Sequence, residues 1–209
     1  AKLMYGSGLR ASECHNLRIR DIDLINDIIF IRGAKGGEGR GSLLPKSMKD
    51  DLTKHIEESR RLYLMDRQLN YPGVYIPSSF KERENRSKSW DWFWLFPADS
   101  VKPSRDGVGL YRYSQPKYHL QKSFKKSFRK VGIQEKYSLD ILRHSFAVHL
   151  LENGTNIRVV QELLGHRDIW RVMVYQKLVK KAIERARSPL DTFYERLRRS
   201  HENDDNGRL

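Results

Sequence analysis

Hydrophobic residues recur at helical spacing along most of the chain, and β-branched runs are confined to one short stretch. Helices are expected over residues 47–68, 117–130, 140–152, 155–165 and 170–187, with a further C-terminal helix over 188–200. The run at 27–32 and a second short strand near 42–45 flank the glycine-rich GAKGGEGRG, which predicts a β-hairpin with a flexible tip. The expected fold class is mostly α with a small antiparallel β-sheet (α+β).

Polar and glycine residues mark where some of these helices begin and end. Ser47 with Asp50 three residues later forms a capping-box pattern ahead of the first long helix. Thr155 is the predicted N-cap of NIRVVQELLG, and Gly165 closes that helix. Near the amino end, the YGSG stretch at residues 5–8 predicts a turn before a short helix.

Residues 70–115 differ from the rest of the chain. They hold most of the proline and all but one of the tryptophans, and they look irregular. Such a stretch inside a compact domain is normally functional or disordered, and the aromatic content argues against disorder. We expect one main domain over residues 1–187 with an insert around 70–100, the helix 188–200, and a disordered tail over 201–209.

The balance of charge indicates a polyanionic partner. The 209 residues include 40 Lys and Arg against 26 Asp and Glu, which gives a net charge of +14.

The longest apolar run, residues 92–96, is far too short to span a membrane, so we expect a soluble protein. The single cysteine, Cys14, excludes a disulfide framework and a Cys-cluster zinc site, and it is typical of a reducing compartment such as the cytoplasm. Because the chain starts at Ala1 without an initiator Met, we expect the C-terminal part of a longer protein.

The helix expected at residues 117–130 is cationic and amphipathic. Leu120, Phe124 and Phe128 recur at i, i+4 and i+8, and basic residues alternate with them. We expect its cations to contact nucleic-acid phosphates: Lys117, Lys122, Lys125, Lys126, Arg129 and Lys130.

Two basic residues near the amino end could meet a phosphate. Arg10 follows a Gly-Ser-Gly turn at the start of a helix, where free amides and a guanidinium could bind together. The alternative is a surface arginine, or one paired with Glu13 at i+3. Lys35 lies in the hairpin tip, which fails the nucleotide-binding patterns and is better interpreted as a mobile loop that carries the lysine into a groove. The alternative there is a solvated turn with an incidental lysine.

The stretch SLDILRHSFAVHLLENGTNIRVVQELLGHRDIWRVMVYQKL, at residues 138–178, resembles the C-terminal signature of the tyrosine recombinases, the phage-integrase family. That signature has His-x-x-Arg opening a helix, then Leu-Gly-His, then a tyrosine nine residues beyond. Arg143, His166 and Tyr175 match it. YGSGLRASE resembles the family's first arginine box, with Arg10, and Lys35 lies at the hairpin position of the family's catalytic lysine.

Within the family the chain looks most like the integron integrases. The likeness rests on YIPSSFKERENRSKSWDWFWLFP, on SRDGVG and on the closing RSPLD. In those enzymes the insert helps to bind folded single-stranded recombination sites through extrahelical bases, which implies that Trp92 and Trp94 contact DNA. The alternative is an edge strand whose aromatic side chains pack on the core. The resemblance covers roughly residues 1–195, and we expect the family's amino-terminal core-binding domain to be missing from this sequence.

The resemblance implies that the main domain is catalytic and that it breaks and rejoins DNA through a 3′-phosphotyrosyl intermediate. Arg10 and Arg143 would neutralise the phosphate, and Tyr175 would attack phosphorus. Lys35 would protonate the leaving 5′-oxygen, and His166 would donate a hydrogen bond to the phosphate. No metal, ATP or other cofactor is expected. The partner would be DNA, bound by a homotetramer in the bacterial nucleoid, with the C-terminal helix a candidate for exchange between protomers.

Two positions depart from the family pattern. Asp140 stands where the family has the His of His-x-x-Arg, and a carboxylate beside a phosphate adds repulsion instead of a donor. The resemblance therefore predicts reduced activity, with Asp140 as a catalytic-site residue; the alternative is a helix N-cap. In the hairpin, Glu38 replaces a basic residue common in integron integrases, whereas Arg40 matches and is expected to bind DNA.

Two other functions stay open. A catalytically impaired DNA-binding remnant would keep the same basic groove, and covalent trapping on DNA would distinguish it from an active enzyme. A relative of type IB topoisomerases would use the same nucleophile on duplex DNA, but the integron-like insert and RSPLD have no role in such an enzyme.

Overall fold

The computed structural model describes residues 1–33, 39–76, 83–104, 107, 109–133 and 137–179. In chain order the helices and strands are α1 (Lys2–Ser7), α2 (Ala11–His15), β1 (Ile22–Asp23), β2 (Ile28–Ile31), β3 (Arg40–Leu43), α3 (Lys49–Gln68), α4 (Arg83–Lys88), β4 (Pro97–Pro103), β5 (Leu110–Ser114), α5 (Lys117–Lys130), α6 (Asp140–Glu152), α7 (Ile157–Leu164) and α8 (Trp170–Leu178). Short 3₁₀ turns occupy Ile19–Asp21, Lys46–Met48 and Trp90–Trp92. The predicted class, mostly α with a small antiparallel sheet, is confirmed, although there are two such sheets.

The first sheet contains the predicted hairpin. Its strand order is β1-β2-β3, all antiparallel, and Ile31 at the end of β2 pairs with Arg40 at the start of β3. Ile29 and Ile31 are buried because alternate side chains of β2 face the core. Lys35 and the rest of the tip, residues 34–38, lie outside the described residues.

The second sheet corrects the expectation that residues 70–115 are irregular throughout. β4 and β5 form an antiparallel hairpin with an irregular register between Pro97 and Val101. The sequence did not predict β4, because its residues, PADSVKP, have low β-propensity. A tertiary interaction compensates, since the guanidinium of Arg112 on β5 donates to both carboxylate oxygens of Asp66 on α3, and both side chains are buried.

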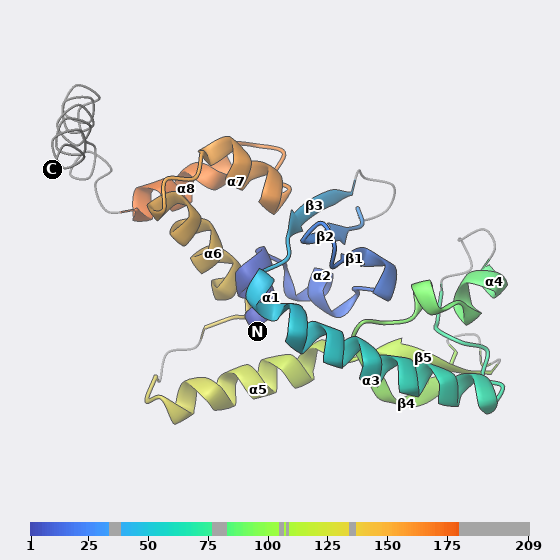
Figure 1. Cartoon of the computed structure of the whole chain (residues 1–209). Coiled ribbons are helices and arrows are strands. Elements are labelled where there is room, and N and C mark those ends of the chain that lie inside the picture. The colour runs from blue at the N-terminus through green and yellow to red at the C-terminus, as the bar shows by residue number, and fades with distance from the viewer. Residues whose placement is uncertain (34–38, 77–82, 105–106, 108, 134–136, 180–209) are drawn as a thin grey trace, which may run out of the picture.

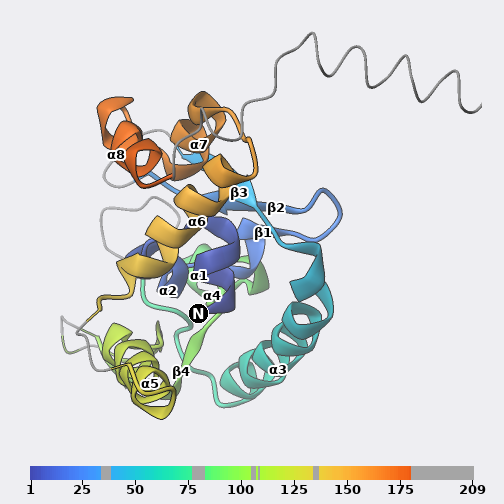
Figure 2. The same ribbon diagram turned by 90° about the vertical axis from the view of Figure 1, so that its left-hand side faces the viewer.

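Helices from the two ends of the chain pack together. α6 packs against α1, α7 and α8, and α7 also packs against β3. Figures 1 and 2 both show α7 and α8 at one end of the molecule and α5 at the opposite end. The bundle of α6, α7 and α8 has its own core, formed by Phe146, Ala147, Val160, Leu164, Val172 and Tyr175.

The larger core joins the amino-terminal helices to α3 and α5. Met4, Ile29, Leu52 and Phe124 come from four different elements and are all buried in it. Phe124 lies on the predicted apolar face of α5, whose bounds are those expected from the sequence. The basic residues of α5 are therefore left on its exposed side.

Three predicted helix ends were wrong. Ser47 lies in the 3₁₀ turn before α3, whose N-cap is Met48, with no side-chain capping bond. Asn156, not Thr155, caps α7, because its side-chain oxygen accepts from the backbone N–H of Arg158 at 2.8 Å. The expected turn at residues 5–8 is mostly helical, since α1 continues to Ser7 and only then ends, at Gly8 in the left-handed conformation.

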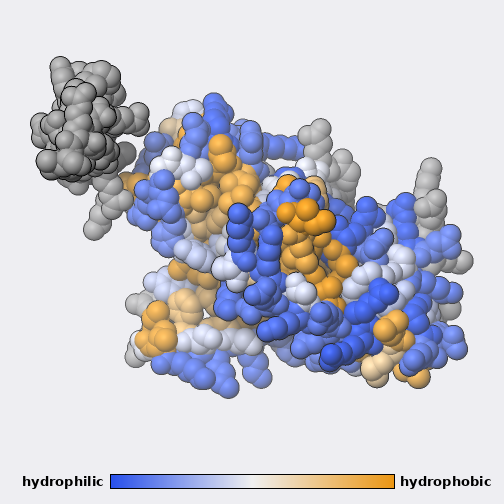
Figure 3. Space-filling model, in the orientation of Figure 1, coloured by the Kyte–Doolittle hydropathy of each residue, from blue (hydrophilic) through white to orange (hydrophobic). Residues whose placement is uncertain are grey.

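One face of the molecule is mainly hydrophilic (Figure 3). Figure 3 shows polar residues over most of one face, interrupted by separate hydrophobic patches. Within the described part of the chain, no helix has both the length and the apolar character needed to cross a membrane.

The buried pair between Asp66 and Arg112 makes a stability prediction. Asp66→Ala leaves the Arg112 guanidinium buried without its carboxylate, which should lower the free energy of unfolding by about 3–5 kcal/mol in urea denaturation. Asp51→Ala is the matched control, because Asp51 pairs with Lys2 on the exposed surface and should change stability little. Equal losses for the two variants would contradict this account.

Candidate active site

Glu13 on α2 stands at the centre of a cluster of arginines. Arg10 is the N-cap of α2, and its backbone N–H donates to Glu13 Oε2 at 2.8 Å while its Nη1 donates to Oε1 at 2.9 Å. The pairing of Arg10 with Glu13, left open from the sequence, is therefore present. Burial by itself raises the pKa of Glu13, but hydrogen bonds from Arg40 and from the Arg10 backbone outweigh it and hold the pKa below its ordinary value.

Arg40 from β3 meets the same carboxylate. Its Nη1 and Nη2 donate to Glu13 Oε1 and Oε2 at 3.0 and 2.8 Å, and its Nε donates to the Leu163 carbonyl at 2.9 Å. Gly165 makes room for this side chain, since a Cβ at that position would lie 2.8 Å from Arg40 Cδ. Three donor atoms of Arg40 are thus used within the protein, which gives this predicted DNA-binding residue a structural role as well.

Arg143 from α6 also belongs to this cluster of arginines. It is 3% exposed, and its guanidinium donates to the carbonyls of Gly8 and Leu164. Its Nη1 lies 3.5 Å from Glu13 Oε2, and its Nη2 lies 3.2 Å from His166 Nε2. Burial, followed by the charge of Arg10, lowers the pKa of Arg143 to about 10, so the guanidinium stays charged at neutral pH.

His166 follows the left-handed Gly165 that ends α7. Burial, followed by the charges of Arg143 and Arg10, lowers its pKa to about 4. A neutral imidazole that accepts from Arg143 at Nε2 carries its proton on Nδ1, and Nδ1 is buried without a partner among the described residues. In this tautomer the Nδ1–H of His166 is buried and has no acceptor among the described residues.

A hollow of about 660 Å³ adjoins these groups. Arg10, Arg40 and His166 line it, together with Gly33 and Gly39 on either side of the hairpin tip. The segment that carries Lys35 therefore leaves and rejoins the described chain at the rim of this hollow.

Tyr175 lies on α8 in the core of the α6–α8 bundle and is only 7% exposed. Its hydroxyl lies 2.8 Å from Nδ1 of His144 on α6. Burial raises the pKa of Tyr175, the positive charges of Arg143 and Arg10 oppose that rise, and the charge of Asp140 adds to it.

Asp140 is an exposed residue in the first turn of α6. The N-cap is Leu139, so the alternative of Asp140 as the N-cap is wrong. A carboxylate in the first turn nevertheless interacts favourably with the helix dipole.

The residues predicted to bind DNA are divided between the surface and the core. The cations of α5 are exposed: Lys117, Lys122, Lys125, Lys126, Arg129 and Lys130.

Trp92 and Trp94 are 9% and 8% exposed and pack with Val74, Ile76 and Phe93. The Arg18 guanidinium lies 3.7 Å from the ring centroid of Trp94. Their burial fits the alternative of core packing, although Trp92 lies in a 3₁₀ turn rather than a strand.

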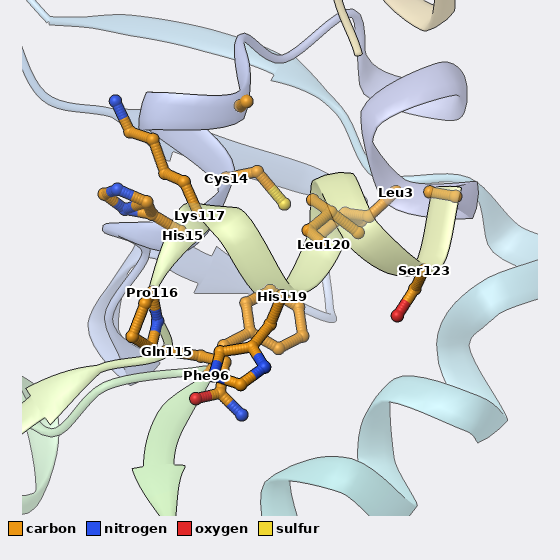
Figure 4. A pocket seen from close by; sticks show the side chains of 12 residues that line it. Leu3, Cys14, His15, Phe96, Gln115, Pro116, Lys117, His119, Leu120 and Ser123 are labelled. Atoms are coloured by element: carbon orange, nitrogen blue, oxygen red, sulfur yellow. The ribbon is translucent and has the colours of Figure 1, made fainter. Parts of the chain in front are cut away.

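A second hollow, of about 240 Å³, lies where α5 meets α2, and Figure 4 shows Cys14, His15 and Lys117 around it. Among the described residues, none of those predicted to be catalytic lines it. Burial raises the pKa of the Cys14 thiol to about 11, so Cys14 is an unreactive packing residue. No group of three or more His, Cys, Asp or Glu in the described chain could hold a metal ion.

Comparison with known proteins shows which family the chain belongs to. The sequence pattern of the phage integrase family matches residues 1–182. The chain belongs to the phage integrase family. Within this family it is 37% identical over 196 residues to an integrase/recombinase of Escherichia coli, covering 92% of this chain and 58% of that protein. It is 31% identical over 188 residues to the tyrosine recombinase XerA of Pyrococcus furiosus, covering 88% and 52%. The chain thus spans little more than half the length of these relatives.

Solved structures from the phage integrase family share the fold. A XerH site-specific recombinase bound to palindromic difH substrate has a TM-score of 0.58 and 25% identity, covering 91% of this chain and 44% of that one. A XerA recombinase has a TM-score of 0.54 and 24% identity, covering 83% and 50%.

The structure shows contacts of two residues, Glu13 and His144, that were not expected from the sequence. Glu13 was considered only as a local partner of Arg10, and nothing in the sequence marks its contact with Arg40, 27 residues later. His144 Nδ1 contacts the hydroxyl of Tyr175, and the sequence did not predict this contact. The adjacent Arg143-His144 pair in the motif helix was the only signal for it in the sequence.

The lowered pKa of His166 can be tested by titration. Because the pKa is about 4, the imidazole NMR signals of His166 should not titrate above about pH 5. Arg171→Gln removes a nearby exposed positive charge and should raise this pKa. The unfolded chain binds the proton near pH 6.5, so His166 should make folding less stable as pH falls from 6.5 toward 4. A His166 titration at an ordinary pKa would contradict the described environment.

Proposed function

We propose that this chain is the catalytic part of a site-specific DNA recombinase that breaks and rejoins DNA through a 3′-phosphotyrosyl intermediate. The observation that carries the proposal is the position of Arg143. Its guanidinium lies within 3.5 Å of both Glu13, the partner of Arg10, and His166. Three motifs far apart in the sequence therefore meet at one positively charged point.

The charges suit a phosphodiester that gains negative charge during attack. Arg10 is 41% exposed at its side chain and lines the hollow, where its guanidinium could contact a nonbridging oxygen. Arg143 is buried behind it and adds a fixed positive charge. His166, which lines the hollow, is assigned a hydrogen bond to the phosphate, and Tyr175 is assigned the attack on phosphorus.

We assign Lys35 the protonation of the leaving 5′-oxygen, and the position of the hairpin ends at the rim of the hollow supports this role. Asp140 offers no donor to a phosphate, so cleavage should be slower than with a histidine at this position.

The integron-integrase likeness narrows the proposed substrate to folded single-stranded recombination sites. Support comes from the sequence stretches YIPSSFKERENRSKSWDWFWLFP, SRDGVG and RSPLD. Assembly as a homotetramer on DNA, with the helix 188–200 exchanged between protomers, belongs to the same proposal; that segment lies outside the described residues. The curated relatives named integrase/recombinase and XerA fit a role in recombination.

The nucleophile is tested by covalent trapping. Incubation with a nicked suicide substrate should give a protease-sensitive DNA adduct on a denaturing gel, and Tyr175→Phe should give none because it lacks the attacking oxygen. Tyr5→Phe is the matched control, since Tyr5 also lies 2.8 Å from a histidine Nδ1 on α6 and has no assigned role in the reaction. Equal adduct from wild type and Tyr175→Phe would end the assignment, and no adduct from wild type would favour a DNA-binding remnant.

The role of α5 is tested by the salt dependence of DNA binding. Replacing Lys122, Lys125 and Lys126 with Gln should weaken binding to all sequences, because these exposed cations are assigned to phosphates. The slope of log K against log salt should become shallower by about 0.7–0.9 for each phosphate that is no longer neutralised. A matched triple replacement of exposed cations elsewhere, at Lys46, Lys54 and Arg61, should change the slope less. Equal changes would mean that only net charge matters.

A further inference from the structure

The Tyr175 hydroxyl is held by a histidine that the family signature does not assign. His144 Nδ1 lies 2.8 Å from the hydroxyl oxygen, and the two ring centroids are 5.5 Å apart with 41° between the ring planes. Tyr175 is buried, whereas His144 is exposed on α6. The contact thus joins a buried nucleophile to an imidazole that reaches solvent.

A nucleophile in this environment needs a base. Phenol oxygen attacks phosphorus effectively only when it loses its proton, and burial raises the pKa of Tyr175 above its ordinary value. The charges of Arg143 and Arg10 oppose the rise without cancelling it, and Asp140 strengthens it. Tyr175 therefore enters the reaction protonated.

The other described groups near Tyr175 are poorly placed to remove that proton. His166 uses Nε2 to accept from Arg143, and its pKa of about 4 makes it a weak base. Asp140 influences Tyr175 through its charge, but among the described contacts the hydroxyl bonds to His144.

We propose that His144 is the proton acceptor for Tyr175, an assignment that rests on the proposed strand-transfer function. With the imidazole proton on Nε2, the phenol O–H donates to the lone pair on Nδ1. As the Tyr175 Oη–phosphorus bond forms, the phenolic proton passes to Nδ1 and gives an imidazolium. The bond between phosphorus and the 5′-oxygen breaks, and that oxygen takes a proton from Lys35 or from water. The reverse step returns the proton from His144 to Tyr175 as the 5′-hydroxyl attacks.

The same helix provides a control for this contact. His149, five residues further along α6, is also exposed and also has its Nδ1 2.8 Å from a tyrosine hydroxyl, that of Tyr5. The two pairs share bond type, bond length and helix, but only the first includes the proposed nucleophile. Any difference between His144→Ala and His149→Ala therefore reflects the reaction rather than loss of a helix contact.

The decisive measurement is the single-turnover rate of adduct formation on a nicked suicide substrate. His144→Ala should be slower by about 100-fold, the scale of general base catalysis, and His149→Ala should stay close to wild type. Free imidazole in the buffer should restore part of the rate to His144→Ala. His144→Asn should remain slow, because an amide can orient the phenol but cannot take its proton.

A substrate with sulfur as the bridging 5′ atom separates the two proton transfers. Sulfur leaves as a thiolate without needing a proton, so His144→Ala should remain slow relative to wild type on this substrate. Recovery of the wild-type rate would show that His144 acts on the leaving group and would overturn the proposal. A His144→Ala rate within about twofold of wild type, or full activity of His144→Asn, would overturn it as well.

Failure of the proposed function would give a different result. If wild type forms no adduct on either substrate, strand transfer is absent and the proton-transfer proposal falls with it. Carbon-13 NMR of labelled tyrosine reports the contact without turnover, because His144→Ala should shift the Tyr175 titration and His149→Ala should not. Adduct formation by wild type together with an unchanged Tyr175 titration in His144→Ala would refute the His144 assignment alone.

Discussion

The candidate active site depends on a single carboxylate. Glu13 accepts hydrogen bonds from Arg10 and Arg40 and lies 3.5 Å from Arg143. Without it, three guanidinium groups would repel one another, and the charges of Arg10 and Arg40 already lower the pKa of Arg143. One negative charge among three positive ones links α2, β3 and α6 while leaving a positive excess for a phosphate. Removing Glu13 would therefore damage both the fold and the site.

Backbone carbonyl groups and two glycines also hold the arginine cluster in place. Arg143 is held by the carbonyls of Gly8 and Leu164, and both chain segments turn at glycines with positive φ. A Cβ at Gly8 would lie 2.5 Å from the Phe146 ring, and one at Gly165 would collide with Arg40. These two glycines allow α1 and α7 to end against the arginines, so the site is built from helix ends as much as from side chains.

Hydrophobic periodicity and turn residues predicted the elements that form from short-range sequence patterns. α5 and α6 have the bounds expected from apolar spacing, and the β2–β3 hairpin follows from its β-branched run and glycines. The β4–β5 hairpin could not be predicted because its stability comes from Arg112 and Asp66, 46 residues apart. Arg10, Arg143, His166 and Tyr175 were matched by family resemblance. The meeting of Arg10 and Arg143 at Glu13, and the contact of Arg143 with His166, needed the three-dimensional structure.

The same limit applies to Asp140, which looked only unfavourable from the sequence. Its carboxylate raises the pKa of Tyr175, which makes a separate base more necessary. Asp140 and His144 are four residues apart on α6, so they share one helical face. Asp140 therefore has two effects on the proposed reaction: it offers no donor to the phosphate, and its charge makes the Tyr175 proton harder to remove. Both effects slow the proposed attack, and a base at His144 would offset the second.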